Sequence, residues 1–198
     1  MMGLMSAGKW NLMHHIALGD PSKPELETKD VMRDEWQNKV QLQQMAMTSM
    51  NIGDIMSVKY NRRLKALVKE HSDGIILVID ATRTDSQDME EILSELKQYV
   101  LDANETKDSV LLVLVNRSDK EVRDFSLLDL GDELSIGQGA ISIHQIEQNV
   151  TETLVRHNRG SQCFTVRPVS SETGVGIWHA LDWFVDELNN RGKEISDL

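Results

Sequence analysis

The chain contains two unbroken apolar runs, at residues 75–79 and 110–115, each as long as one strand. Continuous runs of Val, Ile and Leu are typical of parallel strands that are covered on both faces. Both runs therefore predict strands in the interior of a sheet. A third strand is predicted at residues 163–166, and the loose alternation of apolar and polar residues over 40–50 predicts an edge strand.

Between these strands the apolar residues recur three or four positions apart, which is the spacing of an amphipathic helix. This spacing predicts helices around residues 60–68, 89–100, 143–154 and 177–188. Strands that alternate with helices predict the α/β class, here a doubly wound, mostly parallel sheet. Ligands of such sheets bind at the carboxyl ends of the strands, so the segments that follow the strands are the candidates for chemistry.

The length of 198 residues fits one domain, with a core over residues 3–190 and a flexible tail over residues 191–198. The net charge of −11 argues against a nucleic-acid partner, because phosphate backbones would be repelled. No stretch approaches the roughly 20 apolar residues of a membrane span. The sequence thus predicts a protein that neither binds nucleic acid nor has a transmembrane segment.

Cys163 is the one cysteine of the chain, which excludes a disulfide framework and a cysteine-ligated zinc site. We expect a buried thiol in a reducing compartment, which predicts an intracellular, cytoplasmic protein. The adjacent His14 and His15 project from different faces of one predicted helix, so they do not suggest a metal site. No lipid anchor is expected, because Ala7 stands where the acylation motif needs Ser or Thr.

A glycine-rich loop near the start carries the first candidate chemistry. Residues 3–9 fit the pattern G-x-x-x-x-G-K, in which backbone N–H groups and a helix N-terminus surround phosphate oxygens. The lysine of this pattern pairs with the phosphates. The candidate phosphate-binding residues are Gly3, Ser6, Ala7, Gly8 and Lys9.

Two further segments follow strands and suit a guanine base. Residues 116–119 read Asn-Arg-Ser-Asp; the Asp carboxylate accepts from both ring donors of guanine, a pattern that adenine reverses, while the Asn holds the loop. After the third predicted strand, a serine pair opens a turn that presents backbone N–H groups to a base carbonyl. The candidate guanine-binding residues are Asn116, Arg117, Asp119, Ser170 and Ser171.

With these three motifs in this order, the chain resembles the ADP-ribosylation-factor-like (ARF-like) small GTPases. The resemblance covers residues 3–20 and 50–190, whereas residues 21–49 have no clear match. It implies a P-loop small-GTPase fold, bound GTP or GDP, protein effectors and a part in intracellular trafficking. The most similar segments are residues 73–81, 111–119, 174–177 and 181–183.

The resemblance also implies a buried strand before the phosphate loop, yet only Met1 and Met2 precede Gly3. Without three or four buried aliphatic residues the fold would lose roughly 5–10 kcal/mol. That loss is comparable to the whole stability of a domain, about 5–15 kcal/mol. Either another segment takes the place of this strand, or the strand is truncated in this sequence and the natural start lies upstream; we expect the truncation.

Four positions depart from the family pattern. Trp10 stands where the family has a hydroxyl that binds Mg²⁺, and Asn51 stands where an aspartate supports the water shell of the metal. Asp54 replaces the glycine that contacts the γ-phosphate, and Ile55 replaces the glutamine that orients the attacking water. A shift of the alignment by one residue restores a glycine, Gly53, but no glutamine. These departures argue against a Mg²⁺ site and against hydrolysis.

Three hypotheses follow from the sequence. The first is a divergent GTP- or GDP-binding protein with weak or absent hydrolysis that acts as a regulatory adaptor. The second is an interaction module on a pseudoGTPase fold that binds no nucleotide. The third is a working GTPase with an unusual switch, or one that a partner protein completes.

Overall fold

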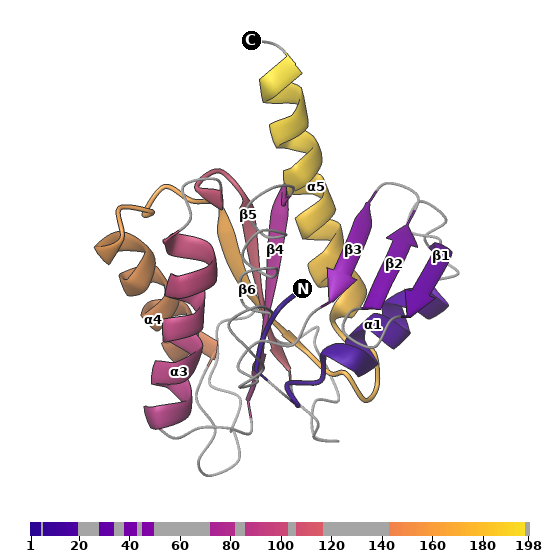
Figure 1. Cartoon of the computed structure of the whole chain (residues 1–198), viewed down its shortest axis with the longest axis horizontal. Coiled ribbons are helices and arrows are strands. Elements are labelled where there is room, and N and C mark those ends of the chain that lie inside the picture. The colour runs from indigo at the N-terminus through magenta and orange to yellow at the C-terminus, as the bar shows by residue number, and fades with distance from the viewer. Residues whose placement is uncertain are drawn as a thin grey trace.

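The computed structural model describes residues 1–4, 6–19, 28–33, 38–42, 45–49, 72–81, 86–102, 106–116 and 143–196. Three parallel strands form its centre, in the order β4 (Gly74–Asp80), β5 (Val110–Asn116) and β6 (Phe164–Val169). Figure 1 shows β5 between its two neighbours. The three strands predicted for the parallel sheet are confirmed.

The register of this sheet brings the ends of its strands together. Asp80 lies opposite Asn116, and Asn116 lies opposite Val169. All seven residues of β5 are buried, as expected for a strand that has a neighbour on each side and helices on both faces. The segments that follow the strands therefore meet at one edge of the sheet.

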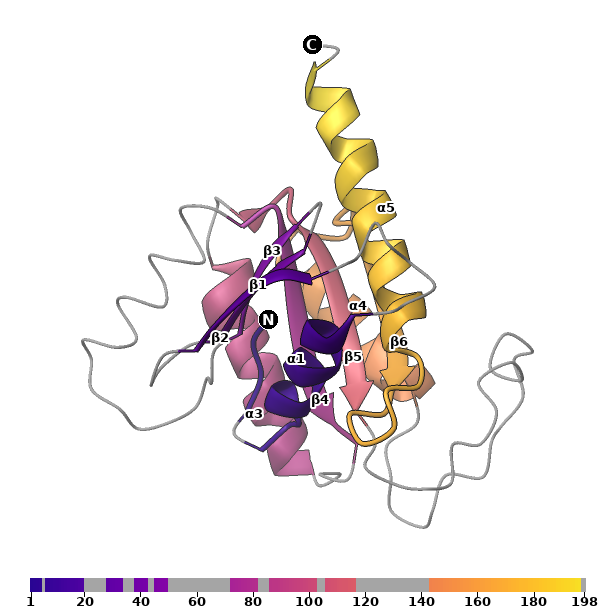
Figure 2. The ribbon, with the colours of Figure 1, turned by 90° about the vertical axis from the view of Figure 1, so that its right-hand side faces the viewer.

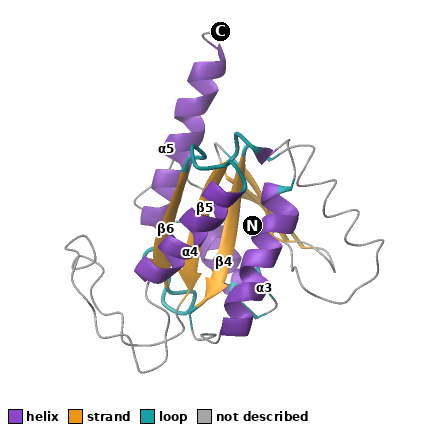
Figure 3. Cartoon of the chain, turned by 90° about the vertical axis from the view of Figure 1, so that its left-hand side faces the viewer, coloured by secondary structure: helices purple, strands orange, loops and turns teal. Residues whose placement is uncertain are grey.

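Helices cover both faces of the sheet, as Figures 1 and 3 show. On one face lie α3 (Ser86–Leu96), its π-helical continuation η2 (Lys97–Leu101) and α4 (Ile143–Arg156). On the other face lie α1 (Lys9–Leu18) and α5 (Ile177–Ser196), and Figure 2 shows α1 in front of β4. The doubly wound α/β fold predicted from the sequence is confirmed.

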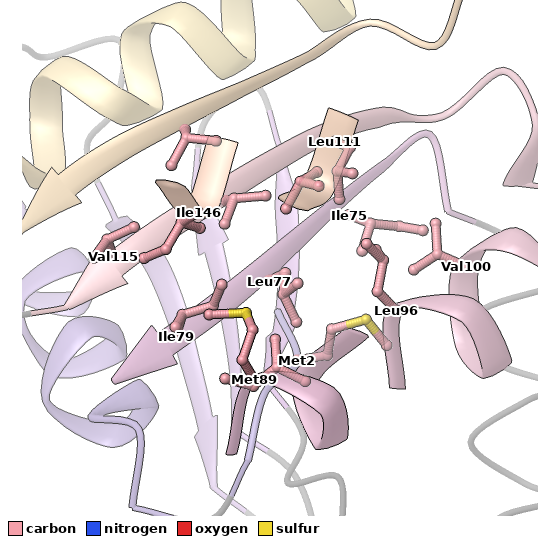
Figure 4. Packing of buried hydrophobic residues seen from close by; sticks show 14 of the residues in the cluster. Met2, Ile75, Leu77, Ile79, Met89, Leu96, Val100, Leu111, Val115 and Ile146 are labelled. Atoms are coloured by element: carbon pink, nitrogen blue, oxygen red, sulfur yellow. The ribbon is translucent and has the colours of Figure 1, made fainter. Parts of the chain in front are cut away.

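The alternation of side chains along each strand divides the core into two clusters. In β4, Leu77 and Ile79 face α3 and α4, where Figure 4 shows them beside Met89 and Ile146. Val78, which lies between them, belongs to the opposite cluster with residues of α1 and α5. Because both faces of the strand are covered, its sequence is an unbroken apolar run rather than an alternating one.

A second, antiparallel sheet consists of β1 (Thr28–Arg33), β2 (Asn38–Leu42) and β3 (Ala46–Ser49), in that order. It lies beside α1, where the side chain of Met47 is buried in the same cluster as Leu12 and Met13. The prediction of one edge strand over residues 40–50 is wrong, since these residues belong to two strands that pair with each other. Alternation with a period of two is shared by both strands of a hairpin, so it did not reveal the reversal of the chain.

The backbone of Met2 lies on the edge of β4 that β5 leaves open, immediately before the phosphate loop. It pairs in parallel with Leu77, donating to the Ile76 carbonyl at 2.7 Å and accepting from the Val78 N–H at 2.8 Å. Met2 therefore takes the position of a strand residue that leads into the loop. The expectation of further strand residues upstream stays a prediction.

Three of the four predicted helices are confirmed by α3, α4 and α5; the one around residues 60–68 lies outside the described residues. The last helix continues to Ser196, so residues 191–196, which we expected in a flexible tail, are helical. Its final turns project beyond the sheet (Figure 1). Among the described residues, no helix combines the length and hydropathy that crossing a bilayer requires.

The single thiol is less buried than we predicted. Cys163 directly precedes β6 and is only partly buried, with its Sγ donating to Glu187 Oε2 at 3.5 Å. Partial burial, together with the negative charge of Glu187, raises the pKa of this thiol. The prediction of a buried thiol is wrong, because Cys163 lies at the end of β6, which pairs with β5 alone among the described strands.

Candidate nucleotide-binding site

The glycine-rich loop between Met2 and α1 has the backbone that its sequence predicts. Ser6 has φ 66° and Gly8 has φ 86°, both in the left-handed region. Left-handed residues in a loop turn successive N–H groups to one side, which creates a concavity suited to anions. Gly8 is also the N-cap of α1, so the positive end of the helix dipole faces the loop.

Close contacts require glycine at both ends of this loop. A Cβ on Gly3, whose φ is 150°, would lie 2.3 Å from the carbonyl oxygen of Val78. A Cβ on Gly8 would lie 2.1 Å from Nδ2 of Asn116. Both distances are far below van der Waals contact, so the two glycines allow the loop to pack on β4 and on the end of β5.

Lys9 lies inside the curve of the loop and is 4% exposed. Its Nζ donates to the carbonyl of Gly3 at 2.7 Å and to that of Leu4 at 2.5 Å. Both acceptors are backbone carbonyl oxygens of the loop itself, so the ammonium ties the start of the loop to α1. The loop therefore combines the Lys9 ammonium, a helix N-terminus and left-handed backbone positions, a combination that fits phosphate.

Asn116, the last residue of β5, connects the phosphate loop to the turn after β6. Its Nδ2 donates to the carbonyl of Ala7 at 3.0 Å, and its Oδ1 accepts from the Ser171 N–H at 2.8 Å. The side chain is 5% exposed, so both ends of a buried amide are hydrogen-bonded. Asn116, the first residue of the predicted guanine motif at 116–119, thereby joins the phosphate loop to the serine turn.

The turn after β6 is closed by its own backbone. The Gly174 N–H donates to the Ser170 carbonyl at 2.9 Å, and the Ser170 N–H donates to the Val175 carbonyl at 3.0 Å. The Ser170 hydroxyl accepts from the Thr173 N–H at 3.2 Å. The N–H of Ser171, which the sequence assigns to a base carbonyl, donates to Asn116 in this structure.

The first turn of α1 carries Trp10 directly after the buried lysine, and its side chain is 46% exposed. An indole offers one N–H donor and no oxygen. Since Mg²⁺ takes oxygen ligands in octahedral geometry, this position does not fit the metal that a hydroxyl there would hold. The remaining predicted site residues, Arg117, Asp119, Asn51, Asp54 and Ile55, lie outside the described residues.

The structure adds one residue to which the sequence assigned no role. The imidazole of His15 lies against Gly174, so that a Cβ on this glycine would be 3.0 Å from His15 Nδ1. The two residues are far apart in the chain, and neither periodicity nor spacing relates them. The one local signal is the glycine itself: Gly174 has φ +80°, a conformation that residues with a side chain rarely adopt.

Comparison with known families shows a match over nearly the whole chain. The model described as "Arf: ADP-ribosylation factor family" matches residues 1–188. The match includes the phosphate loop, Asn116 and the serine turn. It also covers residues 21–49, for which the sequence motifs alone gave no clear counterpart.

Proposed function

The chain belongs to the ADP-ribosylation factor family of small GTPases, and on this basis we propose that it is a divergent member that binds GTP or GDP with little dependence on Mg²⁺ and with negligible hydrolysis. It serves as a regulatory adaptor in the cytoplasm, where the bound nucleotide sets the conformation that protein effectors of intracellular trafficking recognise. Its metal and catalytic positions have been lost, while its binding positions remain.

The observation that carries this proposal is the bridge made by Asn116. One buried amide holds the phosphate loop at Ala7 and the serine turn at Ser171. A nucleotide spans the distance from phosphates to base, so the two ends of its site must be held at a fixed separation. The bridge supports a site that is preorganised for such a ligand.

The loss of metal dependence is supported by Trp10. The position after the lysine carries an exposed indole, and an indole has no oxygen to offer to Mg²⁺. The phosphate charge must then be balanced by Lys9, by the N–H groups of the loop and by the helix dipole. When Mg²⁺ is bound in a small GTPase it neutralises developing charge on the phosphates, so a protein without it is expected to hydrolyse slowly.

A second candidate, an interaction module that binds no nucleotide, is favoured by the contacts of Lys9. The ammonium already donates to the carbonyls of Gly3 and Leu4, so the loop partly satisfies the cation that phosphate would use. The two candidates differ in nucleotide content. Purified protein is denatured and its supernatant is separated by ion exchange: about one guanine nucleotide per chain supports the proposal, whereas a folded protein without nucleotide supports the module.

The base assignment is tested by Asp119→Asn. Loss of the carboxylate that accepts from both ring donors of guanine is expected to abolish the preference for GTP and GDP over ATP, measured as the rise in melting temperature with each nucleotide. Xanthosine triphosphate is the control for Asp119→Asn, because xanthine carries a carbonyl where guanine carries an amino group, and the amide N–H of asparagine can donate to it. Unchanged guanine preference would refute the assignment.

The metal assignment is tested by Trp10→Thr, with Trp10→Phe as the matched control. Threonine supplies a hydroxyl, so chelation of Mg²⁺ is expected to speed release of a fluorescent GDP analogue from Trp10→Thr but not from the natural protein or from Trp10→Phe. Single-turnover release of phosphate from GTP completes the test. A rate above that of free GTP would show an active enzyme instead.

A further inference from the structure

We propose that His15 is a positioning residue of the nucleotide site, which holds the turn of residues 170–176 in register with the phosphate loop and so slows nucleotide release. The inference rests on the proposed function. It concerns a residue outside every motif of the site, on the helix that follows the phosphate loop.

The first step is the contact between two segments that are distant in sequence. The ring of His15 fills the space in front of Gly174: a Cβ on that glycine would lie 3.0 Å from Nδ1 and 3.2 Å from Cε1. Such distances are tighter than ordinary van der Waals contact, so the imidazole and the glycine backbone leave no space between them. His15 is half-buried, whereas its neighbour His14 is exposed.

The second step is that this contact closes a ring of interactions. Asn116 links the phosphate loop to Ser171, and the turn of Ser171 continues to Gly174. From Gly174 the contact with His15 leads back along α1 to Lys9, whose Nζ binds the phosphate loop. Without His15 the turn keeps its link through Asn116 and the approach of the Ser171 hydroxyl to Gly8, but loses its contact with α1 at Gly174.

The third step is rigidity. His15 is six residues after Lys9 in one helix, a rise of about 9 Å. A helix keeps this separation fixed, so the imidazole contacts the turn at a constant distance from the phosphate loop. The turn can move away from the loop only if it separates from His15 or if α1 moves with it.

The central experiment measures release of a fluorescent GDP analogue from the 198-residue chain. His15→Ala is expected to release it about fivefold faster, which corresponds to about 1 kcal/mol and lies within the range of coupling energies for residues in contact. His15→Gln, whose flat amide fills much of the same space, is expected to restore slow release. His14→Ala is the matched control and should leave the rate unchanged.

A double-mutant cycle with Gly174→Ala isolates the contact. Alanine at φ +80° is strained in either background, and the strain cancels in the cycle. The added Cβ collides with the imidazole only when His15 is present. Gly174→Ala is therefore expected to speed release more in the natural background than in His15→Ala, while additive effects would overturn the proposal.

The outcomes separate this inference from the proposed function. If the natural chain binds nucleotide and His15→Ala releases it at the natural rate, the inference fails and the proposed function stands. If the natural chain binds no nucleotide, the proposed function fails. Hydrogen exchange of the Ser171 amide then tests whether His15 still holds the turn in place. Faster exchange in His15→Ala than in His14→Ala would retain the positioning role, and equal exchange would end it.

Discussion

At the scale of single residues, the candidate site is held together by buried side chains whose polar atoms are hydrogen-bonded. Asn116 is the clearest case, since its amide joins Ala7 to Ser171 and is 5% exposed. An asparagine at a strand end would ordinarily be interpreted as a turn residue. Its role as a bridge follows from the parallel register, which places the ends of β5 and β6 side by side.

We expect Asn116→Ala to lower the free energy of unfolding by about 2–4 kcal/mol, because the Ala7 carbonyl and the Ser171 N–H each lose a buried partner. Urea denaturation of the nucleotide-free chain measures the loss. Asn189→Ala is the control, since that asparagine is exposed on α5 and should change stability by less than about 0.5 kcal/mol. Equal effects of the two variants would contradict the bridge.

At the scale of elements, the packing of each helix explains which of its positions matter. In α4, Leu154 is 1% exposed and belongs to the cluster under α3, whereas Val155, the next residue, is 60% exposed. Both residues are aliphatic and both lie inside α4, one position apart. Burial, which the spacing of apolar residues predicts for Leu154, decides their contribution.

Leu154→Ala should destabilise the chain by about 2–5 kcal/mol, because it removes buried methyl groups and leaves a cavity. Val155→Ala should be nearly neutral, since its side chain is largely in water and alanine is the better helix former. Thermal or urea unfolding of both variants, side by side, is the measurement. Comparable losses would mean that α4 packs through a different face.

The hairpin of β2 and β3 shows the limit of prediction from periodicity. The apolar positions alternate through both strands, so one continuous strand and two paired strands produce the same pattern. The structure resolves the ambiguity through the register, in which Val40 lies opposite Met47. The buried side chain of Met47, against α1, fixes the orientation of β3.

At the scale of the whole molecule, the two sheets differ in how they are held. β5 pairs with β4 and β6 along its length, and all of its residues are buried. β1 pairs with β2, and its register shifts between Thr28 and Asp30; no other strand in the described part of the chain pairs with it. A strand with two partners under two helical layers opens only when the whole domain unfolds.

Amide hydrogen exchange followed by mass spectrometry should therefore show β5 as the slowest segment, with a free energy of opening close to that of global unfolding. Exchange in β1 should be faster and should depend less on denaturant, because the small sheet can open while the parallel sheet persists. Equal protection in the two strands would indicate that both sheets unfold as one unit.

The sequence by itself determined the parallel sheet, three of its helices and the family, and it predicts a phosphate loop at residues 3–9. These features are local or periodic: an unbroken apolar run, a helical spacing, a glycine pattern before Lys9. It also predicts positions at which the chain departs from the family pattern, of which Trp10 is the one that lies among the described residues. Each of these inferences needs only neighbours along the chain.

Only the tertiary structure decided which distant groups meet. The pairing of β2 with β3, the bond from the Ser171 N–H to Asn116 and the contact of His15 with Gly174 join segments that no local pattern relates. The physical reason is that sequence periodicity reports burial, whereas hydrogen-bond partners depend on how whole elements pack. The candidate site is therefore recognisable from its motifs, but its internal bonds are set by the register of β5 and β6 and by the position of α1.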